Sequence, residues 1–388
     1  MIDFELSEEQ RAMQILAREF TENEIKPIAV ERDRKADHRD CFQWDIVDKL
    51  SQVGFRTLTV DKRYGGAGAD SLTTAIVLEE LAAGDLGVSV LVAQTVKYAQ
   101  LIQWKGTEEL RQKYLIPFCN DDRFLIAATI TEVDFGSDSV SGYEEGRVTT
   151  NAALDGDEWV INGAKAWSSG AAQAKLFMVL VNTKKGKASI LVPRDTPGVT
   201  IGRMHDCVGG RLFPTAEVFY DNVRVPKENI LGEPREKVDP MCRFMRASNV
   251  YAAACALGVG RAAYETALEY AKIRVQGGKR IIEHQAIGMM LANMFAQLEA
   301  ARLLYWKAAW AADHDEFYDA KLHPMSKVIC SEVAVRVAIQ ALEIHGGYGI
   351  TKDFTVEKYV RDAVSFLHSD GTRQALMLRT AKGLAQGW

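Results

Sequence analysis

Hydrophobic residues recur every three to four positions at the start of the chain, which is the period of an amphipathic helix. Ser7 and Gln10 have the spacing of a capping box at the head of the first such run. A second run with mostly apolar residues opens at Ser71. We therefore predict a helical domain over residues 1–120.

The pattern changes near residue 121 to short segments rich in β-branched and aromatic residues, separated by turns. The pairs Asp155–Gly156 and Asn162–Gly163 are strong hairpin signals, because Asn, Asp and Gly accept a positive φ. These features predict a compact all-β unit, a small β-barrel or a sandwich, over residues 121–235.

Beyond this unit the pattern is helical again. Residues 239–273 and 281–313 are two long, largely apolar stretches, joined by a segment with two glycines that breaks the helix. Shorter helices follow, and the last is expected to begin at Asp370. We predict a four-helix bundle over residues 236–388 and, from its large apolar surface, packing against copies of the same chain. The fold as a whole is expected to be mostly α with a central β unit.

The composition and net charge of the chain argue against several classes of partner. The 388-residue chain is 47% hydrophobic and 26% charged, which is typical of a soluble globular protein. Its net charge of −5 leaves no basic excess to neutralise phosphates, so we expect no nucleic-acid partner. The sequence has no apolar run long enough to span a bilayer and no signal-peptide pattern at its start. Six scattered cysteines without a CxxC pair favour free thiols in a reducing cytoplasm over a metal site.

Three segments, two in the β unit and one between the two long helical stretches, combine glycine, hydroxyl, aromatic or basic residues. ITEVDFGSDSVSG (130–142) offers backbone N–H and hydroxyl donors after a strand, although a plain strand-end turn would have the same composition. Trp167 in AWSSG presents a flat apolar face, which is also typical of a core residue. Arg274 in RVQGGKR stands at a helix end, where an arginine commonly caps the last carbonyl groups.

The fourth segment is EIHGGYGITKDFTVEKYVRDAVSFLHSDGT (343–372). The stretch at its end, FLHSDGTRQALMLR (366–379), raises a choice between structure and chemistry. Asp370, Gly371 and Thr372 suit a helix start, where a short side chain caps free N–H groups and a negative charge meets the helix dipole. A carboxylate in such a loop could instead take a proton from a substrate. His368 is a second, weaker candidate for that role.

Helices, a β unit and a helix bundle, with these four segments in this order and spacing, resemble the acyl-CoA dehydrogenase family of flavoproteins over essentially the whole chain. The resemblance implies bound FAD and the α,β-dehydrogenation of an acyl-CoA thioester, with hydride transfer to flavin N5. It also implies an electron-transferring flavoprotein as the electron acceptor and a homotetramer as the assembly.

The same resemblance assigns residues to the flavin. Ile130 and Thr131 are expected to bond the pyrimidine edge, and Ser137 to hold a phosphate or the CoA linkage. Trp167 is expected against one face of the isoalloxazine ring, with Ser169 near N5, where a donor stabilises the charge of the reduced flavin.

The dinucleotide end of FAD is assigned by resemblance to a second group of residues. Arg274 and Gln276 would reach the FAD pyrophosphate of a neighbouring subunit, and Gly346 and Gly347 would permit close approach of the backbone to the dinucleotide. Glu343 stands where Gln is common in the family, which brings a carboxylate near a phosphate.

Two further departures from the family pattern concern the cofactor. Val133-Asp134-Phe135 stands where Pro-Gly-Ala is usual, so this loop is bulkier and carries an extra charge. Gly277 replaces the usual Phe, so we expect the adenine end to be held in another way.

The family's usual base is a Glu in a Y-E-G-T pattern, which reads Ser369-Asp370-Gly371-Thr372 here. A carboxylate is kept, one methylene shorter, and Asp370 is therefore the expected base. Some members carry the base on the first long bundle helix, but Ser248 and Asn249 stand there and neither can serve. The resemblance also implies substrate contacts from Ser137, Ser248, Ser369 and Gly371, and a cofactor contact from Thr372.

These changes suggest a substrate. The shorter base and the loss of the Tyr ring at Ser369 open space beside the α-carbon, which favours an α-branched or alicyclic acyl group such as cyclohexanecarboxyl. Residues 86–96, by resemblance the wall of the distal pocket, contain no Arg to bind a dicarboxylyl group and no acidic residue to act as a remote base. Two alternatives remain: a nitroalkane-oxidase-like flavoenzyme on the same fold, and a non-catalytic flavoprotein scaffold.

Overall fold

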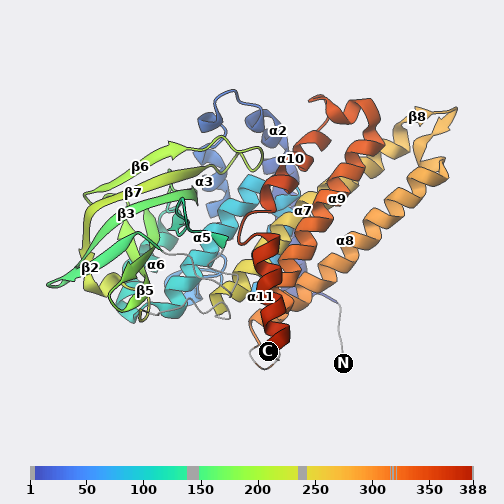
Figure 1. Cartoon of the computed structure of the whole chain (residues 1–388). Coiled ribbons are helices and arrows are strands. Elements are labelled where there is room, and N and C mark those ends of the chain that lie inside the picture. Colours follow the sequence, from blue (N-terminus) through green and yellow to red (C-terminus); the bar gives the residue numbers. More distant parts are fainter. Residues whose placement is uncertain are drawn as a thin grey trace.

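The computed structural model describes residues 5–137, 148–234, 243–314, 316, 319 and 321–386. The sheet lies at one end of the molecule and the long C-terminal helices at the other, with the N-terminal helices packed along both (Figure 1). Helix α5 contacts both strand β1 and helix α7, so it lies between the sheet and the bundle. This order of helices, sheet and helices confirms the predicted fold class.

The N-terminal part is helical, as predicted. Ser7 and Gln10 form the expected capping box, each side chain accepting a hydrogen bond from the backbone N–H of the other residue. Nearly every residue of helix α5 before Gln103 is buried, and for that reason it shows no polar face. The helices are α1 (Glu8–Phe20), α2 (Lys26–Asp33), α3 (Trp44–Gln52), α4 (Ser71–Ala82), α5 (Leu86–Lys105) and α6 (Glu108–Asn120).

The middle part is a sheet with strand order β1-β4-β2-β3-β7-β6, to which β5 adds by pairing with β4. Among the described strands, β6 pairs only with β7, so the sheet stays open as a half-barrel and does not close into a full barrel. The strands are β1 (Ile126–Thr129), β2 (Asn151–Asp155), β3 (Glu158–Ser169), β4 (Leu176–Thr183), β5 (Gly186–Pro193), β6 (Val199–Met204) and β7 (Thr215–Pro226).

The two hairpin signals have different outcomes. Asp155 pairs with Glu158 across a turn at Gly156, which confirms the first hairpin. The second prediction is wrong, because Asn162–Gly163 lies inside β3, where the register with β7 shifts. A Cβ added at Gly163 would come within 2.6 Å of Thr150, so glycine is needed there for the close approach of the residue just before β2.

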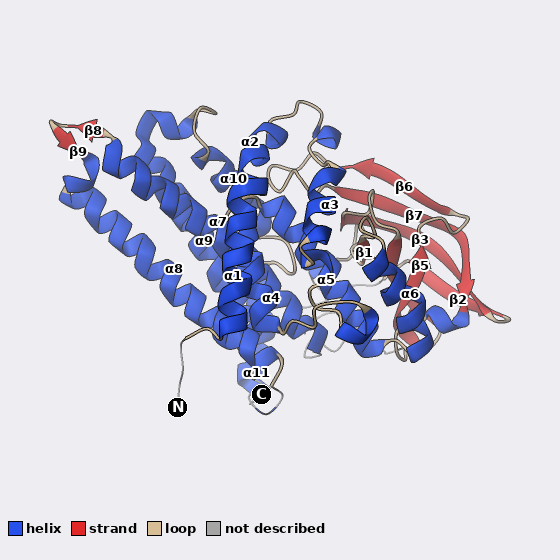
Figure 2. Cartoon of the chain, turned by 180° about the vertical axis from the view of Figure 1, so that it is seen from behind, coloured by secondary structure: helices blue, strands red, loops and turns tan. Residues whose placement is uncertain are grey.

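The C-terminal part is the predicted helix bundle, seen from behind in Figure 2. Helices α7, α8 and α9 pack on one another, α10 packs on α7 and α9, and α11 packs on α9. A two-stranded ribbon, β8 (Val275–Gln276) with β9 (Lys279–Arg280), joins α7 to α8. The helices are α7 (Arg243–Ile273), α8 (Gln285–Ala312), α9 (Leu322–His345), α10 (Val356–Phe366) and α11 (Arg373–Gln386). Residues 239–242 of the predicted first helix lie outside the described residues.

The last helix does not begin at Asp370 as expected. Helix α11 starts at Arg373, and the hydroxyl of Thr372 accepts a hydrogen bond from the N–H of Ala375 at 3.3 Å. Thr372 therefore caps helix α11, and the carboxylate of Asp370 does not.

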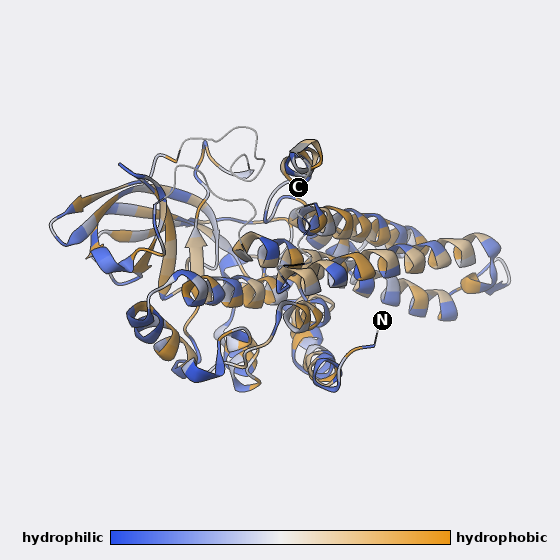
Figure 3. Ribbon diagram, turned by 90° about the horizontal axis from the view of Figure 1, so that it is seen from below, coloured by the Kyte–Doolittle hydropathy of each residue, from blue (hydrophilic) through white to orange (hydrophobic). Residues whose placement is uncertain are grey.

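Apolar side chains gather in one large core shared by the N-terminal helices and the bundle, and in a second core on the inner face of the sheet. Figure 3 shows apolar and polar stretches alternating along the long helices. Among the described cysteines, Cys41, Cys255 and Cys330 are buried free thiols, as expected, while Cys119 and Cys207 are half-buried and free. Cys242 lies outside the described residues.

Two findings concern membranes and metals. None of the helices in the described part of the chain is long and apolar enough to cross a bilayer. The described residues contain no group of three or more His, Cys, Asp or Glu side chains that could hold a metal ion.

Candidate active site

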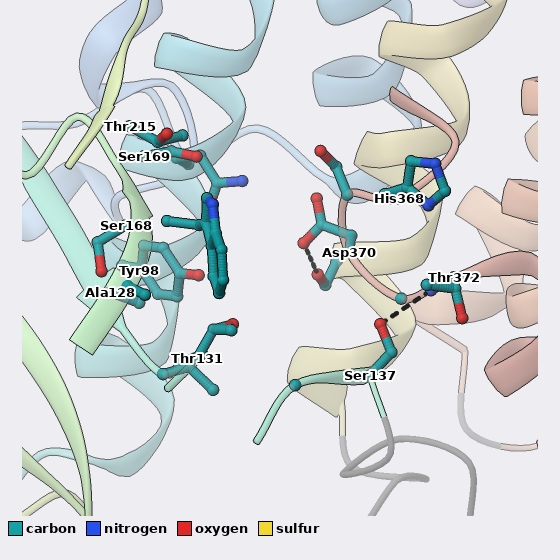
Figure 4. A pocket seen from close by; sticks show the side chains of 18 of the residues that line it. Tyr98, Ala128, Thr131, Ser137, Ser168, Ser169, Thr215, His368, Asp370 and Thr372 are labelled. Carbon is teal, nitrogen blue, oxygen red and sulfur yellow. Dashed lines mark hydrogen bonds between the residues drawn. The ribbon is translucent and has the colours of Figure 1, made fainter. Parts of the chain in front are cut away.

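A cavity of about 550 Å³ lies where the half-barrel meets α5, α7 and the loop before α11. Thr131, Ser168 and Ser169 lie on one side of it, across from Asp370 and His368 (Figure 4). Most of the residues predicted for the flavin ring and the substrate line this cavity: Ile130, Thr131, Ser137, Trp167, Ser169, Ser248, Ser369, Asp370, Gly371 and Thr372. The fold thus brings together segments that are far apart in the sequence.

The residues predicted for the dinucleotide end of FAD do not line this cavity: Arg274, Gln276, Glu343, Gly346 and Gly347. They lie at the end of the bundle marked by β8 in Figure 1, away from the sheet, where Arg274 is half-buried and the other four residues are exposed. There the Arg274 guanidinium lies 5.5 Å from the ring centroid of Tyr348 and donates a hydrogen bond to Gln276 at 3.3 Å. Within one chain, this group is separate from the cavity.

Asp370 stands at a tight corner, with φ +52° followed by φ +100° at Gly371. A left-handed backbone is tolerated by Asp better than by most residues, and Gly adopts it freely. The corner turns the carboxylate toward α5 and α7. There Oδ1 accepts hydrogen bonds from Lys97 Nζ at 2.6 Å and from Ser248 Oγ at 3.0 Å.

Lys97 was missed by the sequence reasoning. It follows directly after residues 86–96, and its side chain is only 1% exposed. Burial is the largest single influence and disfavours its charged form, but the carboxylate of Asp370, together with Tyr98 and Cys255, raises the pKa of Lys97 above its usual value. The available signal was a single charge within a run of uncharged residues on a helix with no polar face.

A second buried lysine holds the loop that carries Asp370. Lys327 of α9 donates hydrogen bonds from Nζ to the carbonyl oxygens of Leu367 at 2.9 Å and Gly371 at 3.0 Å. Burial lowers the pKa of Lys327 to about 8. The N–H of Thr372 also donates to Ser137 Oγ at 3.1 Å, which ties this loop to the half-barrel.

On the opposite wall, a buried ion pair supports the segment with Ile130 and Thr131. Glu132 accepts hydrogen bonds from Lys165 Nζ at 2.8 Å and from the N–H of Thr150 at 3.0 Å. Burial by itself would raise the pKa of Glu132. These bonds and those from Thr149 outweigh burial and lower that pKa to about 2. Lys165 also donates to the carbonyl oxygen of Ile130 at 3.1 Å.

The unusual Val133-Asp134-Phe135 sequence is accommodated by a turn. Phe135 is 2% exposed and packs with Val148 and Leu180, whereas Val133 is 81% exposed. The turn is closed by backbone hydrogen bonds between Glu132 and Phe135. The bulk of this departure therefore points into a small cluster separate from the inner-face core of the sheet or into solvent, and only neighbouring residues line the cavity.

Three family models match almost the whole chain: the acyl-CoA dehydrogenase N-terminal domain over residues 7–122, the middle domain over 127–223 and the C-terminal domain over 243–385. The chain belongs to the acyl-CoA dehydrogenase family. It is therefore an FAD-dependent acyl-CoA dehydrogenase, as the resemblance implied.

Known relatives cover the same length of chain. A short-chain specific acyl-CoA dehydrogenase of Clostridium acetobutylicum is 34% identical over 97% of this chain and 98% of its own. A 3-(aryl)acrylate reductase of Clostridium sporogenes is also 34% identical, over 97% of this chain and 99% of its own. The butyryl-CoA dehydrogenase structure from Megasphaera elsdenii is 32% identical, with a TM-score of 0.91 over 99% of this chain and 100% of that one.

The cavity walls fit the ring system of FAD. Trp167 has φ +51°, which is a strained backbone for so large a residue, and its side chain is half-exposed beside His205 with a ring-centroid separation of 5.8 Å. The buried hydroxyl of Ser168 has no hydrogen-bond partner among the described residues. An exposed aromatic face and an unpaired hydroxyl suit a flat heterocycle with polar edges.

Proposed function

We propose that this enzyme removes the α-proton of an acyl-CoA thioester with the carboxylate of Asp370 while a hydride leaves the β-carbon. The observation that carries the proposal is the position of Asp370. Its side chain lines the cavity across from Ser169, and its side-chain partners among the described residues, Lys97 and Ser248, both bond Oδ1. Among the described residues Oδ2 has no partner, so it is available to a substrate proton.

The proposed reaction is a 1,2-elimination of a proton and a hydride. The α-proton goes to Asp370, two electrons and the β-hydrogen leave as hydride, and a carbon–carbon double bond forms between the α- and β-carbons. When bound, FAD supplies the hydride acceptor at N5. The backbone N–H of Asp370 donates to the thioester oxygen and so acidifies the α-proton. Trp167 and Ser169 hold and orient the ring, and Ser137 and Thr372 contact the chains of substrate and cofactor.

The acyl group that we propose is alicyclic or α-branched, such as cyclohexanecarboxyl, giving cyclohex-1-ene-1-carboxyl-CoA. Four small residues, Ser248, Ser365, Ser369 and Gly371, are among those that line the cavity, together with the larger Phe244, Met245 and His368. The small residues support room beside the α-carbon. The names of the relatives include short-chain and butyryl enzymes, so a straight short acyl chain is the competing hypothesis.

An anaerobic flavin-reduction screen tests the substrate. The holoenzyme is mixed with cyclohexanecarboxyl-, 2-methylbutyryl-, butyryl-, octanoyl- and 3-phenylpropionyl-CoA, and bleaching of the flavin absorbance is followed. We expect the fastest bleaching with the cyclohexanecarboxyl thioester and a product two hydrogens lighter by mass spectrometry. Faster bleaching by butyryl- or octanoyl-CoA would overturn the proposed acyl group.

The variant Asp370→Asn tests the base in the same assay. We expect it to bind thioester and to bleach extremely slowly. Bleaching at the wild-type rate would remove Asp370 from the mechanism, and full biological activity of this variant would favour the scaffold hypothesis. Reduction by nitroalkanes without reduction by any CoA thioester would favour the nitroalkane-oxidase-like hypothesis.

For its partners, we propose an electron-transferring flavoprotein as the oxidant and a homotetramer as the assembly. Helix α8 exposes Met289, Phe295, Leu303 and Trp310, which supports further packing between chains. Turnover with a purified electron-transferring flavoprotein and the mass of the holoenzyme by light scattering test these two points.

A further inference from the structure

Three polar groups meet beside the cavity. Lys97 Nζ lies 2.6 Å from Asp370 Oδ1 and 3.3 Å from Ser248 Oγ, and Ser248 Oγ lies 3.0 Å from the same Oδ1. The three residues come from α5, from α7 and from the loop before α11. They form a closed triangle of contacts around one carboxylate oxygen.

The two side chains of the ion pair differ in their access to the cavity. The Asp370 side chain is 14% exposed and lines the cavity, whereas the Lys97 side chain is 1% exposed and does not line it. Lys97 therefore contacts Asp370 but has no path to a substrate atom. A buried ammonium of this kind acts on the reaction only through the carboxylate that it holds.

The main chain on either side of the carboxylate is also anchored. The carbonyl oxygen of Asp370 lies 3.5 Å from Asn249 Nδ2, and Lys327 Nζ donates to the carbonyl oxygen of Gly371 at 3.0 Å. With the backbone fixed, the direction of the carboxylate depends on its own side-chain torsions. The contacts from Lys97 and Ser248 fix these torsions by holding Oδ1.

We infer that Lys97 is a positioning residue, which holds Oδ1 of Asp370 so that Oδ2 points to the α-proton of the thioester. This inference rests on the proposed function of Asp370 and deepens it. An aspartate is one methylene shorter than a glutamate, so its carboxylate has less reach and its position must be set more closely. A displacement of about 1 Å in a reacting group can lower a rate on the order of 100-fold.

The competing explanation is that Lys97 is a counter-ion in the core with no part in the reaction. Both explanations predict some loss of stability when Lys97 is replaced, because a buried charge loses its partner. They differ in whether the effect on the rate passes through Asp370. A double-mutant cycle measures that difference.

The experiment compares wild-type holoenzyme with Lys97→Met, Asp370→Asn and the double variant, each checked for FAD content and thermal midpoint. Stopped-flow bleaching gives the reduction rate and the Kd for the best thioester. For Lys97→Met we expect the rate to fall about 10- to 100-fold and the Kd to stay within about threefold. In the Asp370→Asn background, the same replacement should change the remaining rate by less than about twofold.

A second readout isolates the proton step. Holoenzyme is incubated in D₂O with a thioester that has sulfur in place of the β-carbon and cannot lose hydride. Deuterium uptake at the α-carbon is measured by mass spectrometry. We expect Lys97→Met to slow this exchange as much as it slows bleaching. Equal exchange in Lys97→Met and wild type would overturn the inference.

The outcomes distinguish the positioning role of Lys97 from the role of Asp370 as the base. A Lys97→Met rate equal to wild type, or an undiminished effect of Lys97→Met in the Asp370→Asn background, would overturn the positioning role and leave the base intact. Wild-type bleaching by Asp370→Asn alone would overturn the assignment of Asp370 as the base.

If Lys97→Met does not retain FAD, Ser248→Ala is used instead, because it removes the other contact to Oδ1 and leaves no buried charge without a partner. In that case a wild-type exchange rate in Ser248→Ala would overturn the inference, and a severalfold slower exchange would support it.

Discussion

Lys165 and Glu132 form an ion pair inside the half-barrel, with Nζ of the lysine 2.8 Å from Oε1 of the glutamate. Their side chains are 0% and 5% exposed. Lys165 also bonds the carbonyl oxygen of Ile130, so the pair supports the backbone of a cavity wall. The wall against which the flavin ring is proposed to bind is thus held from behind by two buried charges.

Replacing Glu132 by Gln should destabilise the holoenzyme strongly. The variant leaves the Lys165 ammonium buried without a negative partner, and breaking a buried pair in this way costs about 3–5 kcal/mol. Denaturant unfolding followed by far-UV circular dichroism measures the loss, and FAD released on gel filtration should increase. Glu228→Gln, at an exposed glutamate outside the cavity lining, is the control, with an expected change below about 0.5 kcal/mol. Equal unfolding curves for the two variants would contradict the role of the pair.

The same pair predicts a pH dependence in acid. The pKa of Glu132 is lowered in the folded state from 4.5 to about 2, so its contribution to stability is complete above pH 4.5 and is lost as the pH falls toward 2. The shift corresponds to about 3 kcal/mol. We expect the difference in unfolding free energy between wild type and Glu132→Gln to shrink steadily below pH 4.5. Parallel stability curves from pH 6 to pH 3 would show that this carboxylate does not carry the effect.

Trp167 should contribute to FAD binding through its exposed face. Removing one member of an aromatic pair costs about 0.5–1.5 kcal/mol beyond area burial, so Trp167→Ala should weaken FAD binding by up to about tenfold. Trp167→Phe should retain most of the affinity. The measurement is fluorescence quenching on titration of FAD into deflavinated protein. Trp159→Phe, on the same strand but outside the cavity lining, should leave the affinity unchanged.

Arg274 offers a test of the proposed contact between subunits. If its side chain serves the FAD of a neighbouring chain, then Arg274→Ala and Asp370→Asn damage different sites of the assembly. Each variant alone should be nearly inactive, and mixed subunits should regain activity, because an intact Arg274 then meets an intact Asp370. The two proteins are unfolded together, refolded with FAD and assayed by flavin bleaching. Absence of recovery in well-folded mixed oligomers would argue that Arg274 serves its own chain.

The periodicity of the sequence predicted the order of helices and sheet because long runs with one period leave few alternatives. Local turn chemistry was less reliable. Gly156 makes the turn that a Gly after Asp predicts, but Gly163 is needed for the close approach of Thr150, just before β2. Since that contact is formed only in the folded sheet, a turn residue and a close-packing residue look alike in the sequence.

The sequence predicted the motif residues that face the cavity. It did not predict the buried lysines that hold those residues in place. Asp370 could be found from the Gly and Thr that follow it. The sequence did not show that Thr372, and not Asp370, caps the last helix. Lys97 and Lys165 stand among apolar neighbours, and their partners are distant in sequence. A lysine gives no sign of which carboxylate will neutralise it until the chain is folded.

The hydrogen bond between Ser137 and Thr372 joins residues 235 positions apart at the rim of the cavity. During synthesis on the ribosome, the half-barrel and the first bundle helices emerge well before this loop does. A nascent or prematurely terminated chain would therefore hold most of the fold and none of the proposed chemistry. Under the proposed function, turnover therefore requires that the chain has been synthesised at least through residue 372.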